Sequence, residues 1–137
     1  MTPAHRKLHL VTGAGCHLQL FASTPGAAVR WRLLSGNNRE IARGAQTFPD
    51  ADACRIAIKE MQASIDELES SVRQASAHRW IWQLTDGVEV VATSAHSYDR
   101  LIRCSSGLEH AVAALPVAEV GAGLMFSQAR RWGGGIA

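Results

Sequence analysis

Hydrophobic and polar residues alternate at two well-separated places along the chain. In VRWRLL, Trp31 and Leu33 alternate with arginines, and in RWIWQL, Trp82 and Leu84 belong to a similar series. A period of two predicts a β-strand with one buried and one solvent-exposed face. Turn residues follow each run, GNN in the first case and DG in the second, and then comes another short strand-like run. We therefore expect two β-hairpins of the same design.

The two segments correspond position by position. Trp31 and Leu33 match Trp82 and Leu84 at an offset of 51 residues. After the first turn the offset is 50, and Ile41, Ala42, Phe48, Cys54 and Ile58 match Val91, Ala92, Tyr98, Cys104 and Leu108. The change of one residue falls in the hairpin turn, where a difference in length is tolerated best. The pattern indicates an internal duplication, which decides the fold class.

A helix is expected after each hairpin, beginning within FPDADACRIAI and YDRLIRCSSGL. Pro49 suits the first turn of a helix because its missing N–H needs no partner there. Asp50 and Asp52 are favourable near the positive end of the helix dipole. Each repeat is therefore expected to add a helix to its strands.

Two interpretations of residues 66–75 are open. Hydrophobic residues at positions 54, 58, 61, 65, 68 and 72 would continue the first helix almost to Ala75. The repeat predicts instead that this helix ends near Ile65 and that a strand follows, since the second helix ends at Leu115-Pro116 before the strand-like VAEV. We prefer the strand.

The order W-x-L, turn, I/V-A-x, aromatic residue, cysteine and helix, with LPVAEV after the second helix, resembles the YegP-like family of small bacterial proteins. The resemblance covers His17 to Val120. It implies an α+β fold of tandem, pseudo-two-fold β-β-β-α-β units that share an antiparallel sheet with two helices packed against it. It also implies that the strand after each helix crosses to the partner unit. The function of that family is largely uncharacterised.

We expect residues 1–137 to form a single domain, because two separate cores in so short a chain would each be marginal. Its parts are a leader at 1–16, repeat 1 at 17–66, repeat 2 at 67–120 and a glycine-rich tail at 121–137. The expected core residues occupy equivalent positions in the repeats: Trp31, Leu33, Cys54, Ile58, Trp82, Leu84, Cys104 and Leu108.

Composition excludes several classes of protein. The formal charge of +2 is too small to indicate a nucleic-acid surface, so nucleic acid is disfavoured as a partner. No apolar run reaches the length of a membrane span, and glycines interrupt any signal-like segment near the N-terminus. We expect a cytoplasmic protein without a membrane segment.

The spacing of cysteines and histidines along the chain does not indicate a catalytic or metal-binding site. The three cysteines are odd in number and lack a CxxC spacing, and the six histidines lack the close pairing on one helix that favours a metal site. Cys54 and Cys104 fall on the hydrophobic stripe of their helices, as small core residues do. We therefore expect no metal, no cofactor and no catalytic set, and a non-enzymatic binding or structural module rather than an enzyme.

The alternative function is weak binding of an anion or nucleic acid by repeat 1. Arg30, Arg32, Arg39 and Arg43 are expected on its outer sheet face, where guanidinium groups can hold phosphate or carboxylate. Repeat 2 has Ile81 in place of the first of these arginines, so the site would be confined to one repeat.

The tail GAGLMFSQARRWGGGIA combines apolar side chains with glycines. Leu124, Met125, Phe126 and Trp132 could dock on a sheet or on a second chain. The sequence identifies no partner, but a homodimer that involves this tail is one expectation.

Overall fold

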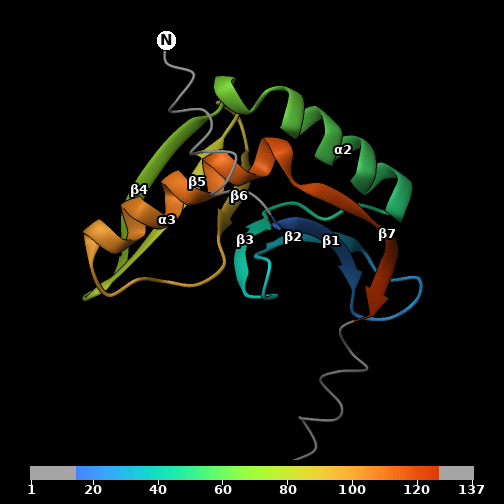
Figure 1. Cartoon of the computed structure of the whole chain (residues 1–137), viewed down its shortest axis with the longest axis horizontal. Coiled ribbons are helices and arrows are strands. Elements are labelled where there is room, and N and C mark those ends of the chain that lie inside the picture. The colour runs from blue at the N-terminus through green and yellow to red at the C-terminus, as the bar shows by residue number, and fades with distance from the viewer. Residues whose placement is uncertain (1–14, 127–137) are drawn as a thin grey trace, which may run out of the picture.

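The structure is a computed structural model that describes residues 15–126, and it contains a seven-stranded sheet with two α-helices above it (Figure 1). The elements in chain order are β1 (His17–Ala22), β2 (Val29–Leu34), β3 (Glu40–Gly44), α2 (Ala51–Ala63), a 3-10 turn η1 (Ile65–Glu67), β4 (Glu69–Ser76), β5 (Arg79–Thr85), β6 (Val90–Ser94), α3 (Leu101–Ala114), a second 3-10 turn η2 (Leu115–Val117) and β7 (Glu119–Phe126). The fold class is α+β, as expected.

The strand order is β4-β5-β6-β3-β2-β1-β7, so one sheet runs through the whole described chain. Its two middle strands, β3 and β6, pair antiparallel, with Ala42 opposite Ser94 and Gly44 opposite Ala92. β4 follows α2 and pairs with β5, whereas β7 follows α3 and pairs with β1. Each post-helical strand therefore joins the other half of the sheet, as the resemblance implies.

The expectation of an antiparallel sheet is wrong at one edge, because β7 runs parallel to β1 and makes the sheet mixed. β1 already occupies the place beside β2, as its antiparallel hairpin partner. β7 must therefore add to the free edge of β1. A parallel pair needs a long connection, and the crossover through α3 provides one.

Residues 69–76 form β4, which confirms the strand interpretation of this segment. Ser64 caps α2 at its C-terminus, and η1 buries Ile65 before the chain becomes extended. In β4, Val72 lies directly opposite Trp82 of β5. A continued helix would have left that edge of β5 without backbone partners.

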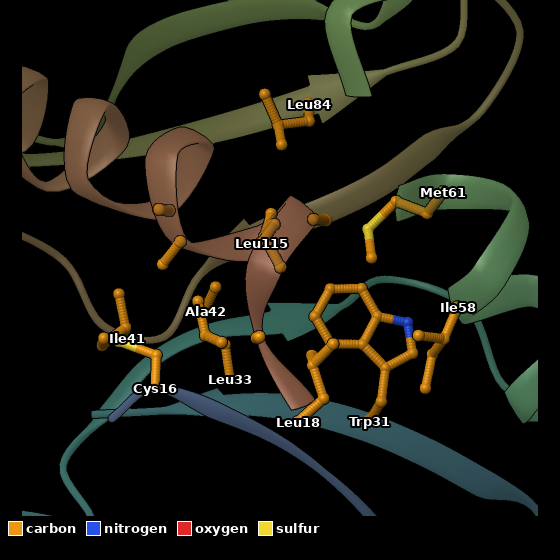
Figure 2. Close-up of a cluster of buried hydrophobic side chains, with 14 of the residues drawn as sticks. Cys16, Leu18, Trp31, Leu33, Ile41, Ala42, Ile58, Met61, Leu84 and Leu115 are labelled. Carbon is orange, nitrogen blue, oxygen red and sulfur yellow. The ribbon is translucent and has the colours of Figure 1, made fainter. Parts of the chain in front are cut away.

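One hydrophobic core joins both halves between the sheet and the helices. Seven of the eight expected core residues are buried, and Leu108 is partly buried against the same cluster. Figure 2 shows the indole of Trp31 surrounded by Leu18 of β1 and by Ile58 and Met61 of α2. Gly44 lies against the face of this indole, so closely that a Cβ atom there would be 2.5 Å from Nε1 of Trp31.

The two helices begin differently. Asp50 is the N-cap of α2, and its carboxylate accepts a hydrogen bond from the backbone N–H of Ala53 at 2.8 Å. Pro49 lies before this cap and not in the first turn. Arg100 occupies the N-cap of α3, where no side chain caps the helix and the first turn contains no acid. The first-turn N–H groups of α3 therefore receive no hydrogen bond from a capping side chain.

Strand β7 includes residues 121–126 of the predicted tail, and Leu124 and Phe126 pack against the core, while Met125 is exposed. Trp132 and the leader up to residue 14 lie outside the described residues. No helix within 15–126 has the length and apolar character needed to cross a membrane.

Candidate functional site

Three of the four predicted arginines lie on the sheet face that points away from the core. Arg32 of β2 lies opposite Gln19 of β1 and opposite Arg43 of β3. Arg30 lies two residues earlier on the same face of β2, since Trp31 between them is buried. Arg39 is exposed in the turn between β2 and β3. The structure thus brings Arg30, Arg32 and Arg43 together and leaves Arg39 at the rim.

Contacts with neighbouring side chains hold two of these guanidinium groups in place. Arg32 donates from Nε to Oε1 of Gln19 at 2.8 Å and lies 4.9 Å from the ring centroid of Phe21. Arg43 donates to Glu40 at 2.5 Å in an exposed ion pair. Exposed pairs of this kind contribute about 0–1 kcal/mol, so Glu40 holds the Arg43 guanidinium only weakly.

A row of polar side chains extends this face across six strands. The cross-strand partners in the row, from β1 to β4, are Gln19, Arg32, Arg43, Thr93, Gln83 and Ser71. Hydrogen-bonding groups therefore follow a line perpendicular to the strands.

A depression of about 620 Å³ lies at the N-terminus of α3, a site that sequence reasoning missed. Arg79 of β5, His96 and Tyr98 of the β6–α3 connection, and Arg103 of α3 are among its lining residues. Arg79 donates from Nε to Oγ of Ser97 at 2.8 Å and to the Ser97 carbonyl at 3.1 Å. These bonds fix its guanidinium at the wall of the depression.

Positive charge dominates this depression. The guanidinium groups of Arg79 and Arg103 face a single carboxylate in the lining, that of Asp99. The N-terminus of α3, which has no capping side chain, adds the partial positive charge of the helix dipole. The imidazole of His96 packs against the Tyr98 ring, with a distance of 4.8 Å between the centroids. An electropositive, concave site favours a small anion.

The corresponding place beside α2 has a different character. Asp50 and Asp52 neutralise the start of α2, whereas α3 has Arg100 and Ile102 at these positions. The difference between FPDADA and YDRLIR is a signal in the sequence that could have indicated the site. The depression itself could not be foreseen, because Arg79 reaches it from a distant strand.

Tyr98 contributes its ring to the depression, while its hydroxyl lies under α3. Burial raises the pKa of Tyr98, and the N–H of Trp82, which interacts with the hydroxyl, acts in the opposite direction. This interaction falls short of a well-aligned hydrogen bond, since Nε1 of Trp82 is buried without a hydrogen-bond partner in residues 15–126. The hydroxyl approaches Gly107 so closely that a Cβ atom there would overlap it.

All three cysteines are free thiols in the core and do not contribute to either surface. Burial raises the pKa of Cys16 and Cys104, and it raises the pKa of Cys54 to about 11. Because the thiolate is the reactive form, these thiols are protected from reaction at neutral pH.

Stability should fall as the pH rises from about 9 towards 11, because the Cys54 thiol ionises in the unfolded chain while burial keeps it protonated in the folded core. The pKa of Cys54 is raised on folding to about 11, so its contribution is complete below the unfolded-state pKa and is lost as pH passes the folded-state value. Urea unfolding at a series of pH values measures this loss. In Cys54→Ala the slope between pH 9 and 11 should be shallower than in the wild type, and an unchanged slope would contradict the assignment to Cys54.

Groups of three or more His, Cys, Asp or Glu side chains that could hold a metal ion do not occur within residues 15–126. Neither the polar row nor the depression therefore contains a protein metal site of that kind. Both surfaces present donors and positive charge, which suit an anionic ligand.

The fold resembles that of two solved structures. No family model matches the sequence, and none of the curated proteins matches it. The solution NMR structure of yegP from E. coli, a protein of unknown function, superposes with a TM-score of 0.61 at 14% identity, covering 80% of this chain and 94% of yegP. A UPF0339 protein from Shewanella oneidensis gives a TM-score of 0.62 at 12% identity and covers 77% and 89% of the two chains. The chain therefore has the fold of the YegP-like proteins.

Proposed function

We propose that the protein is a non-enzymatic binding module, built from two tandem units, that binds a small anion such as a phosphate or carboxylate in the depression beside α3. The observation that carries this proposal is the concave surface with Arg79 and Arg103 at an uncapped helix N-terminus. Arginine forms paired hydrogen bonds with both anion types. Three unpaired cysteines suit a reducing compartment, so we place the module in the cytoplasm.

Equivalent contacts in the two halves support the tandem, pseudo-two-fold organisation. Val29 bridges Phe48 in the first half, and Trp80 bridges Tyr98 in the second. The helix residue next to each aromatic ring matches the size of that ring. In the second half, Gly107 leaves room for the Tyr98 hydroxyl. The first half has the larger Ala57 at the equivalent position, next to Phe48, which has no hydroxyl.

One small-anion site per chain is expected. The positions in the first half that correspond to Arg79, His96 and Arg103 are occupied by Ala28, Gln46 and Ala53. These residues carry no positive charge. The duplication therefore supplies the scaffold, and the second half supplies the binding groups.

Titration of the ¹⁵N-labelled protein with inorganic phosphate tests this site. We expect saturable shifts of the amide signals of Leu101–Arg103 and Tyr98, because the ligand accepts hydrogen bonds near them. Arg103→Ala should weaken binding about tenfold, the loss expected for one charge-assisted hydrogen bond. Arg103 is the cleanest choice, because its side chain makes no hydrogen bond or ion pair within residues 15–126.

Arg100→Ala is the matched control. It removes the same charge from the same end of α3, but Arg100 does not line the depression. Equal losses in the two variants would show that net charge alone attracts phosphate. Shifts scattered over the exposed arginines, without saturation, would overturn the proposal.

The open sheet face is a second candidate, for an extended anion such as a single nucleic-acid strand. The specific observation in its favour is Arg32 lying directly opposite Arg43, since two neighbouring guanidinium groups can bind one phosphate between them in competition with the Glu40 carboxylate. Arg30 and Arg39 extend the basic surface. Titration with a single-stranded oligonucleotide should then shift signals of β1 to β3 and weaken steeply with salt, while those of α3 remain in place.

A further inference from the structure

The two edges of the sheet differ in how they are protected. Figure 1 shows β4 at one end and β7 at the other. At the β7 edge, Arg55 of α2 donates hydrogen bonds to the carbonyls of Gly121 and Ala122. β7 also contains a register shift against β1. Side-chain capping and irregular pairing both make an edge a poor template for another strand.

The β4 edge lacks such protection in the described part of the chain. Seven of the eight residues of β4 are exposed. The irregularity in its pairing with β5 is confined to the end of the strand, between Gln74 and Ser76. Residues 69–74 thus form a regular edge whose outward N–H and C=O groups have no partner strand in residues 15–126. Such an edge favours pairing with another strand.

The charges of β4 are complementary to those of a second β4 strand running antiparallel. Glu69, Ser71 and Arg73 share the outer face, because they lie opposite Thr85, Gln83 and Ile81 of β5. If Ser71 lies opposite Ser71 of a second copy, then Glu69 of each chain lies opposite Arg73 of the other. The two-fold symmetry makes this attraction occur twice.

Other registers lose this complementarity. Sliding one strand by a single residue would place the outer face of one copy beside the inner face of the other. Only a slide by two residues keeps the outer faces together, and it moves the two-fold axis to the next residue of β4. Centring the pair on Val72 places Arg73 opposite Ser71, and centring it on Ser70 places Glu69 opposite Ser71. The register centred on Ser71 is therefore the one that pairs both charges of β4.

We propose that β4 is a homodimerisation edge, on which β4 of a second copy of this chain pairs antiparallel about a two-fold axis at Ser71. The pairing continues the sheet from one copy into the next and satisfies the backbone groups of both edges. None of residues 69–74 lines the depression beside α3 or belongs to the arginines of β2 and β3. The inference is independent of the proposed ligand sites.

Sedimentation equilibrium of the full chain tests the interface through the charges. Glu69→Arg and Arg73→Glu each convert two attractive cross-strand pairs into two repulsive ones, so each should raise the dimer Kd about tenfold or more. The double variant Glu69→Arg/Arg73→Glu exchanges the charges and should return the Kd to within a few-fold of the wild type. Glu109→Arg, the same charge change at an exposed position on α3, is the control and should leave the Kd unchanged.

Cross-linking tests the register. Ser71→Cys should form an intermolecular disulfide under mild oxidation, because the two cysteines face each other at the axis. Ser70→Cys should not, because Ser70 lies opposite Val72 of the other chain. Three results would each overturn the proposal. They are a wild-type chain that stays monomeric, a dimer Kd that neither single charge variant changes, and a double variant whose Kd does not return towards the wild-type value. Recovery by the double variant also excludes misfolding as the cause of the single-variant losses.

Discussion

Trp82→Ala is expected to lower the free energy of unfolding by about 3–5 kcal/mol. The Trp82 side chain is fully buried, with an exposed fraction of 0%. It lies between β4 and β6 in the second half of the core, opposite Val72, and alanine would leave a cavity that the surrounding strands cannot close. Urea unfolding followed by far-UV circular dichroism measures the loss without depending on tryptophan fluorescence.

Trp82→Phe separates the effect of lost side-chain volume from the cost of burying an unpaired indole N–H. The indole N–H is buried without a hydrogen-bond partner in the described chain, so its removal relieves part of the cost of the smaller ring. The loss should therefore be well below that of the alanine variant. Ile56→Ala, at a side chain that is 60% exposed, is the surface control and should change stability by less than about 0.5 kcal/mol. Wild-type stability in Trp82→Ala would contradict the shared core.

Gly107→Ala is expected to destabilise the protein although it lies inside a helix. Alanine normally stabilises a helix by about 1 kcal/mol relative to glycine. Here the added methyl group would overlap the hydroxyl and Cζ of Tyr98, and overpacking of this kind costs about 1–3 kcal/mol. The clash should outweigh the gain in helix propensity. Thermal and urea unfolding of the variant measure the net effect.

Tyr98→Phe tests whether overlap with the Tyr98 hydroxyl causes the loss of stability in Gly107→Ala. In that background the hydroxyl is absent, and Gly107→Ala should lose less stability, with a coupling of about 1 kcal/mol between the two sites. The first half already combines phenylalanine at 48 with alanine at 57, which indicates that such a pair can be accommodated. Equal effects of Gly107→Ala in both backgrounds would show that the helix, and not Tyr98, responds to the methyl group.

Local signals allowed much of the fold to be predicted from the sequence. Alternation at Trp31 and Trp82 identified β2 and β5, because a half-buried strand repeats every two residues. The repeat also ended the first helix correctly, where the hydrophobic periodicity through Leu68 and Val72 favoured a longer one. Periodicity failed there because Leu68 and Val72, four positions apart, lie on one face of an extended chain as well as on one face of a helix.

The candidate site was only partly predictable. The outer-face position of Arg30, Arg32 and Arg43 follows from alternation, but their neighbours do not. Gln19, Phe21 and Glu40 reach these arginines through pairing register and a local irregularity at the end of β2, which a single sequence does not specify. The depression was missed for the same reason.

By itself, the amino-acid sequence indicated the two hairpins, the approximate starts of the helices and the identity of the buried face, since each depends on residues close together along the chain. Only the tertiary structure decided that β7 runs parallel to β1, that Arg79 and Arg103 share a depression, and that β4 is left as an unprotected edge. These features depend on which strands become neighbours. That choice is made by the burial of a common core and the pairing of backbone groups over the whole sheet, which no local pattern contains.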